Sequence, residues 1–174
     1  MANKTVVSLN LSEAGIDKAI EDLQQYKQEL LKKSELLQKR VAEYIQKVAQ
    51  NWFNGAVVDD ILTGDPKIAD VKVTIDERGD ATVVVASGED AVWVEFGAGV
   101  YYNGGAGSSP HPRGSELGML IGEYGAGKGK RKVWGYYDGD ELVLTHGTPA
   151  TMPMEKAFLS AYIDLYTIAR EVFG

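Results

Sequence analysis

Apolar residues recur at helical spacing through the first third of the chain. They follow one another at intervals of three, four and seven, and neither Pro nor Gly occurs between residues 17 and 54. Ser12 stands where the N-cap of such a segment belongs. The pattern predicts one long amphipathic helix over residues 12–53, or two helices joined near Ser34. The stripe consists of Ile16, Ile20, Leu23, Leu30, Leu37, Val41, Tyr44, Val48 and Trp52.

This stripe suits either coiled-coil assembly or packing against a sheet. A coiled coil needs regular heptads with apolar residues at two fixed positions, and the regularity here is marginal. We therefore expect a helix that covers a sheet.

The middle of the chain shows the alternation of a β-hairpin. Apolar and polar residues alternate over residues 71–77, and a more apolar run follows at residues 81–86. The letters ERGD between them predict a tight turn. That turn contains Arg78-Gly79-Asp80, an adhesion tripeptide that the hairpin already explains.

Further strands are predicted on both sides of this hairpin. Residues 91–97, AVWVEFG, alternate again and predict a third strand. Residues 132–137 and 141–145 flank Asp138-Gly139-Asp140, which is a strong hairpin signal. Residues 4–11, KTVVSLNL, are typical of a short edge strand. The strands predict an antiparallel sheet of four to five strands.

A second helical pattern runs from residue 153 to residue 173. Pro153 suits the first helical turn, and Glu155 complements the positive end of the helix dipole. Helices at both ends of a run of strands predict an α+β fold, a single domain over residues 1–174 in which helices pack against the sheet. The apolar stripe of this helix is Phe158, Tyr162, Leu165, Ala169 and Val172.

A long Gly-rich segment separates the third predicted strand from the second hairpin. Residues 102–133 carry a net charge of +3, from five basic and two acidic residues, so the rest of the chain sums to −10 against a total of −7. We expect residues 102–131 to form a flexible basic loop, because a Gly-rich segment loses much backbone entropy when it becomes ordered. Long loops in compact domains tend to be functional. Its candidate contacts to a partner or to DNA are Arg113, Lys128, Lys130, Arg131 and Lys132.

Composition narrows the class of protein. The absence of Cys rules out disulfides and thiolate metal sites. The net charge of −7 argues against a general affinity for DNA phosphates. No apolar run approaches the length of a membrane span, and the N-terminus lacks the apolar core and cleavage site of a signal peptide. We expect a protein made in the cytoplasm, without membrane contact.

Candidate chemistry is sparse. Residues 122–129, GEYGAGKG, approach the phosphate-binding loop GxxxxGK[ST], but Gly129 replaces the hydroxyl and no helix pattern follows. The two histidines, His111 and His146, stand in a loop and a turn without the spacing of a catalytic or metal site. We therefore expect no enzymatic activity, no metal and no cofactor.

Two stretches resemble the motifs of one protein family. Residues 94–99, VEFGAG, resemble its strand end [YW]VEFG[TA]G, and residues 145–150 with 152–157 resemble its TxGxPAxPFxxPA entry to the last helix. Met154 and Lys156 stand where the family often has Phe and Pro. The family is the small tail-component family of long-tailed bacteriophages and prophages. The residues that carry the resemblance are Val94, Glu95, Phe96, Gly97, Gly99, Thr145, Gly147, Pro149, Ala150, Pro153 and Ala157.

The order of the segments is similar as well, including a Thr-Gly turn at Thr63-Gly64, although the Ala-Pro-Val that usually precedes this turn is absent. Members are described as tail-completion, tail-terminator or head-to-tail joining proteins. The resemblance implies a structural virion protein that forms a ring, commonly a hexamer, between the tail tube and the head connector. Its implied partners are other copies of itself, the tail tube protein and connector or stopper proteins, with genomic DNA passing through without sequence-specific contacts.

Two other functions remain open. The long N-terminal helix would suit a non-viral adaptor that self-associates, and the basic loop would suit a protein that contacts nucleic acid.

The glycines and the proline of the two motifs also have a purely structural explanation. Gly97, Gly99, Gly147 and Pro149 are explained equally well as residues that shape the backbone.

Overall fold

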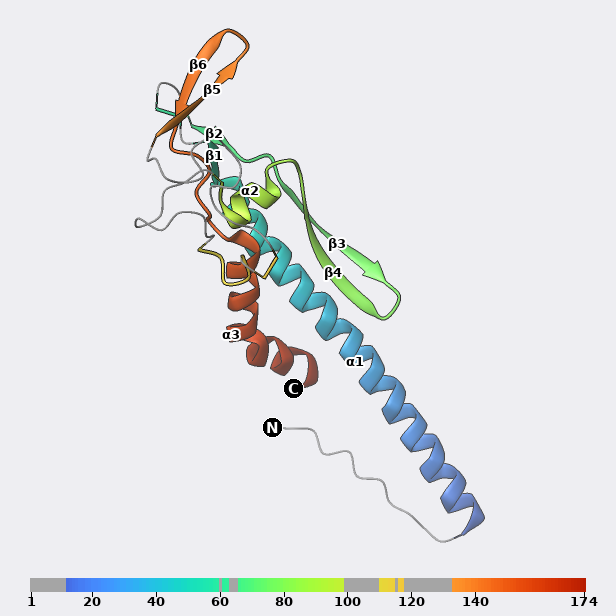
Figure 1. Ribbon diagram of the computed structural model, residues 1–174. Helices are drawn as coiled ribbons and strands as arrows, with labels where there is room; N and C mark the ends of the chain where they lie inside the picture. Colours follow the sequence, from blue (N-terminus) through green and yellow to red (C-terminus); the bar gives the residue numbers. More distant parts are fainter. Residues whose placement is uncertain (1–11, 60, 63–65, 99–109, 115, 118–132) are drawn as a thin grey trace.

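The computed structural model describes residues 12–59, 61–62, 66–98, 110–114, 116–117 and 133–174, which form a mixed helix and sheet fold (Figure 1). The predicted strand at residues 4–11 and the turn at Thr63-Gly64 lie outside the described residues. The elements are the helices α1 (Glu13–Asn54), α2 (Ala91–Phe96) and α3 (Pro153–Phe173) and the strands β1 (Val57–Asp59), β2 (Lys67–Ile68), β3 (Lys72–Arg78), β4 (Ala81–Ser87), β5 (Trp134–Asp138) and β6 (Glu141–Thr145).

The N-terminal helical pattern forms one continuous helix. α1 is 42 residues long and passes through Ser34 without a break, so the alternative of two joined helices is wrong. Its N-cap is Ser12 as predicted, since the Ser12 hydroxyl accepts the backbone N–H of Gly15 over 3.2 Å. At the other end, the helix stops at Gly55.

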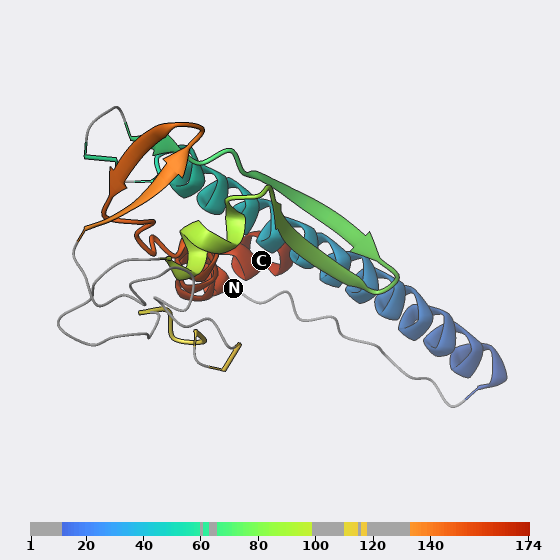
Figure 2. The ribbon, with the colours of Figure 1, turned by 45° about the horizontal axis from the view of Figure 1, so that its top comes forward.

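The buried face of α1 lies one residue away from the predicted stripe. Ala42, Ala49 and Phe53 are buried, whereas Trp52 of the stripe is 46% exposed. The small side chains of the two alanines let neighbouring elements approach the helix closely. Hairpin β3–β4 lies along one side of α1 and α3 lies along another, while the N-terminal half projects beyond both (Figures 1 and 2).

The six strands form three separate antiparallel pairs, β1–β2, β3–β4 and β5–β6, and no larger sheet forms among the described residues. Both predicted hairpins are confirmed, with the pairs Arg78 to Ala81 and Asp138 to Glu141 next to their turns. Gly79 and Gly139 each have a φ of 63°, which a side chain at the first turn position would resist. Hairpin β3–β4 lies beside α1, whereas β5–β6 projects at the other end of the molecule near β1–β2 (Figure 1).

The third predicted strand is wrong, because residues 91–96 form the short helix α2. The backbone N–H of Val94 donates to Asp90 and that of Gly97 donates to Trp93, over 2.9 and 2.7 Å. Val94 and Glu95 are thereby turned into the interior. The buried residues Ala91, Val94 and Glu95 follow helical spacing, but six residues are too few to distinguish this spacing from alternation.

The C-terminal helix begins at Pro153 as predicted and packs against α1. The buried residues at this contact are Ala157 and Ala161, whereas Phe158 and Tyr162 of the predicted stripe are exposed. None of the described helices is long and apolar enough to cross a bilayer. The core cluster consists of Ala49, Phe53, Ala56, Val58, Val71, Val73, Ala91, Val94 and Ala157.

A hydrogen bond ties α1 to α3. The hydroxyl of Tyr44 donates to Asp164 Oδ2 over 2.6 Å. This bond, then burial, and then the charge of Asp164 raise the pKa of Tyr44 above its ordinary value. The stability that the bond contributes is therefore complete below the ordinary tyrosine pKa and is lost as the pH rises through the raised value.

We expect Tyr44→Phe to lower the urea midpoint of unfolding at neutral pH. The same variant should lose less stability than the wild type between about pH 8 and about pH 11. Circular dichroism during urea unfolding at both pH values measures this difference. Tyr137→Phe is the matched control, since the side chain of Tyr137 is 72% exposed and its replacement should leave the alkaline decline unchanged. An equally steep decline in Tyr44→Phe would contradict the assignment.

Candidate functional site

The two segments that carry the family resemblance pack against each other. Ala98 and Thr148 form an antiparallel bridge in which each backbone N–H donates to the carbonyl of the other, over 2.9 and 2.8 Å. The N–H of Thr151 also donates to the carbonyl of Val94 over 2.9 Å. The end of α2 and the entry to α3 therefore form one unit, which we call the motif junction (residues 94–98 and 145–157).

Glu95 performs the task of an N-cap for α3 from a distant part of the chain. Its Oε2 accepts the backbone N–H of Met154 over 2.8 Å, and its Oε1 accepts that of Glu155 over 3.0 Å. Met152, which occupies the N-cap position, makes no side-chain capping bond and has a φ of 53°. An acidic side chain at this end also complements the helix dipole. Glu95 is only 6% exposed, so it belongs to the structure of the junction.

His111 contacts the carboxylate of Glu95 as well. Its Nε2 lies 3.0 Å from Glu95 Oε1, and its Nδ1 lies 3.0 Å from the backbone N of Arg113. Because a backbone N–H can only donate, Nδ1 accepts and the proton is on Nε2, which donates to Glu95. The ring also packs against Phe96, with 4.5 Å between ring centroids. His111 is buried, and nothing in the sequence linked it to Glu95.

The turn into α3 is held by the threonines of the second motif. Thr145 is fully buried, and its hydroxyl accepts the N–H of Gly147, which has a φ of 93°. The hydroxyl of Thr148 donates to the carbonyl of Val58 on β1. Pro149 and Ala150 are half-buried, and Pro153 and Ala157 are buried. Their positions favour a role in shaping this turn.

Gly97 has tight surroundings and an unusual backbone conformation. Its φ of 80° and ψ of 155° belong to a region that is essentially restricted to glycine. A Cβ at this position would lie 3.0 Å from the Cβ of Ala150 and 3.1 Å from its N. The motif residue Gly99 lies outside the described residues. Gly97 thus ends a helix, where the sequence predicted the end of a strand.

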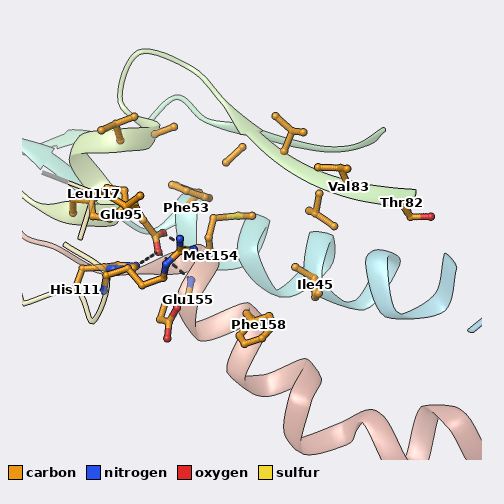
Figure 3. A pocket seen from close by; sticks show the side chains of 17 residues that line it. Ile45, Phe53, Thr82, Val83, Glu95, His111, Leu117, Met154, Glu155 and Phe158 are labelled. Atoms are coloured by element: carbon orange, nitrogen blue, oxygen red, sulfur yellow. Dashed lines mark hydrogen bonds and ion pairs between the residues drawn. The ribbon is translucent and has the colours of Figure 1, made fainter. Parts of the chain in front are cut away.

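An open groove of about 840 Å³ adjoins the motif junction (Figure 3). One wall is strand β4, and Glu95 and His111 lie at one end of the groove, while Thr82 and Val83 lie at the other. The lining is mainly apolar, so the groove is suited to apolar side chains or an extended peptide. The side chains between its walls include Ile45, Phe53, Leu117, Met154 and Phe158.

The candidate contact residues of the Gly-rich loop are only partly described. Arg113 lines the groove and pairs with Glu116 over 3.3 Å. Lys128, Lys130, Arg131 and Lys132 lie outside the described residues, as do residues 122–129 with the near phosphate-binding pattern. The loop is anchored where it is described, because His111 within it is buried against Glu95. Among the described residues, no three His, Cys, Asp or Glu side chains gather as metal ligands.

Large apolar side chains lie on two surfaces outside the core. On α3 they are Phe158, Leu159, Tyr162, Ile163 and Tyr166, and on the projecting part of α1 they are Ile16, Ile20, Leu23, Tyr26 and Leu30. Lys156, which stands where the family often has Pro, places its Nζ 3.9 Å from the ring centroid of Trp52. Contiguous exposed apolar surface of this kind marks sites of interaction.

We compared the chain with known protein families, curated proteins and solved structures. Neither a family model, nor a curated protein, nor a solved structure significantly matches the chain.

Proposed function

We propose that this chain is a structural protein of the neck or tail of a long-tailed phage. Copies of it assemble into a ring that completes or terminates the tail tube and joins it to the head connector, and the resemblance to the family implies a hexamer. The protein is made in the host cytoplasm and becomes part of the virion. The ring surrounds the path of the genomic DNA and makes no sequence-specific contact with it.

The observation that carries this proposal is the exposed apolar face of α3. Tyr162, Ile163 and Tyr166 are 70%, 78% and 73% exposed and follow one another along one side of the helix. A monomer in solution rarely leaves such a face uncovered. Assembly with other copies or with a neighbouring tail protein would bury it.

The motif junction supports the proposal in a different way. The two segments that resemble the phage family lie far apart in the sequence and form one packed unit around Glu95. Each segment needs the other to form the motif junction, and this accounts for the presence of both motifs in one chain. The net charge of −7 also suits the wall of a DNA channel, because like charge keeps phosphates from adhering.

We propose that a sheet of four to five strands forms only in the assembly. The described part of one chain contains only two-stranded sheets. Pairing between strands of adjacent subunits would produce the larger sheet, and it would cover backbone groups at the edges of the pairs.

The Gly-rich loop is the candidate contact to the connector or tail tube. Removing residues 103–130 in one deletion is unsuitable, because it would also remove His111 from its buried bond to Glu95. We therefore expect replacement of residues 118–130 by a short Gly-Ser linker to leave the melting temperature unchanged and to abolish joining of heads to tails. Complementation of a phage that lacks the protein measures joining. A variant that still joins them would exclude the loop as the docking element.

A charge variant separates contact with protein from contact with DNA. Neutralising Lys128, Lys130, Arg131 and Lys132 should abolish salt-dependent DNA binding if the loop grips DNA, as the nucleic-acid alternative requires. Light scattering over a concentration series, with and without isolated tail tubes, tests the ring directly. A chain that ignores tails and self-associates through α1 would favour the adaptor alternative, which the exposed apolar residues on the projecting half of that helix support.

A further inference from the structure

The two outer edges of hairpin β3–β4 differ in how they are protected. On β3, the side chain of Gln50 accepts the N–H of Val73 over 2.8 Å and donates to the carbonyl of Val71 over 2.8 Å. Gln46 donates to the carbonyl of Val73 over 2.9 Å. Side chains of α1 thus satisfy outward backbone groups of the β3 edge. The same strand carries four charged residues, which are Lys72, Asp76, Glu77 and Arg78.

The edge of β4 has none of these protections. In the described part of the chain, β4 pairs only with β3. Its sequence from Ala81 to Ser87, ATVVVAS, contains neither a charge nor a Pro. An uncharged edge of this kind is a template for pairing with another strand.

The hairpin register identifies the backbone groups at this open edge. Arg78 pairs with Ala81 across a two-residue turn, so bonded pairs alternate from that point along the ladder. The N–H and C=O groups of Thr82, Val84 and Ala86 therefore point away from β3. Residues 82–86 also line the groove beside the motif junction, as Figure 3 shows for Thr82 and Val83. An added strand at this edge would lie along the groove.

The chain contains one further segment with the pattern of a strand that would fit there. Residues 4–11, KTVVSLNL, alternate Val7, Leu9 and Leu11 with Ser8 and Asn10. One face of such a strand is apolar and the other polar, as a half-buried added strand requires. The apolar face would meet the apolar lining of the groove, and the polar face would remain in water.

The geometry of α1 excludes pairing within one chain. The helix begins at Glu13, and the start of β4 lies beside Leu31 and Leu36, while the strand continues beside Leu37, Val41 and Ile45. At 1.5 Å per residue, even Leu31 lies about 27 Å from the start of the helix. Residue 11 precedes that start by only two positions, so residues 4–11 cannot lie along β4 of their own chain. A second copy of the chain must supply them.

We propose that residues 4–11 of one subunit add to the β4 edge of a second subunit. Each copy then donates one strand and accepts one strand, which is a head-to-tail contact that closes into a ring when the rotation permits. The inference deepens the proposed function, on whose self-assembly it rests, by naming the contact between subunits.

The test uses a fluorescent peptide of residues 1–12 as the donor strand and the full-length chain carrying Leu9→Lys as the acceptor. The substitution weakens the acceptor's own N-terminal segment, so that its β4 edge remains available to the peptide. Fluorescence anisotropy should show saturable binding of the wild-type peptide. Leu9→Lys in the peptide should weaken binding about tenfold or more, because it puts a charge on the apolar face. Asn10→Lys, on the opposite face, is the matched control and should bind within about threefold of the wild type.

An edge variant tests the acceptor. Adding Thr82→Pro to the full-length Leu9→Lys chain removes an outward N–H without removing a bond to β3, so it should abolish peptide binding at an unchanged circular dichroism spectrum. Strand exchange is overturned if the peptide does not bind, or if both Lys peptides bind equally well. If the chain forms rings on tails but does not bind the peptide, strand exchange is contradicted and the phage function is not. If the peptide binds but the chain does not join heads to tails, the phage function is contradicted and strand exchange is not.

Discussion

Glu95→Ala is expected to lower the free energy of unfolding by about 3–5 kcal/mol. The substitution leaves the partly buried backbone N–H groups of Met154 and Glu155 without their acceptor at the start of α3. It also removes the acceptor for His111, which is buried itself. Since a domain has a total stability of about 5–15 kcal/mol, this loss is a large part of the whole. Urea unfolding followed by circular dichroism measures the change.

Two further variants show which bonds produce this effect. Glu95→Gln keeps one carbonyl oxygen and should cost about half as much. Glu116→Ala replaces an exposed acidic residue nearby, which pairs only with Arg113 at the surface, and should change stability by no more than about 0.5 kcal/mol. A loss below about 1 kcal/mol in Glu95→Ala would mean that Glu95 is not the cap of α3.

Gly97→Ala is expected to cost about 3 kcal/mol. Two causes act together. The backbone at Gly97 has a φ of 80°, which a side chain disfavours, and an added Cβ would lie 3.0 Å from that of Ala150. Relief of the contact would separate α2 from the entry to α3. The melting temperature and the urea midpoint should both fall.

Gly55→Ala provides the matched control for this substitution. Gly55 follows α1 with a φ of −110°, and an added Cβ there would have no atom within 4 Å. Its replacement should therefore leave stability unchanged or raise it by less than about 1 kcal/mol. Equal effects of the two substitutions would show that Gly97 does not hold the junction together.

The elements that sequence reasoning predicted correctly are those with long or local signals. α1 and α3 have apolar spacing sustained over many turns, and both hairpins have a glycine in the first position of a two-residue turn. The short helix α2 was missed because six residues carry too little periodicity to separate a helix from a strand. The buried faces of the long helices were placed on their larger residues, although close approach selected alanines.

The hydrogen bonds of the candidate site were not predicted from the sequence. The motif residues were identified by resemblance, yet the role of Glu95 depends on contacts across 59 and 60 residues of sequence. His111 was expected to be an ordinary loop residue, and only the fold brings it to Glu95, 16 residues away. Periodicity and turn chemistry describe neighbours in sequence, so they carry no information about such bonds.

The unbroken length of α1 has a consequence for how large an assembly of this chain is. A helix of 42 residues is a rod about 63 Å long, and its two ends keep a fixed distance and a fixed angular phase. One residue more or fewer would shift Ser12, at the start of the helix, by about 1.5 Å and rotate it by about 100° around the rod. In the proposed assembly, the number of helical residues would therefore set the distance between a contact at the start of α1 and a contact at its end.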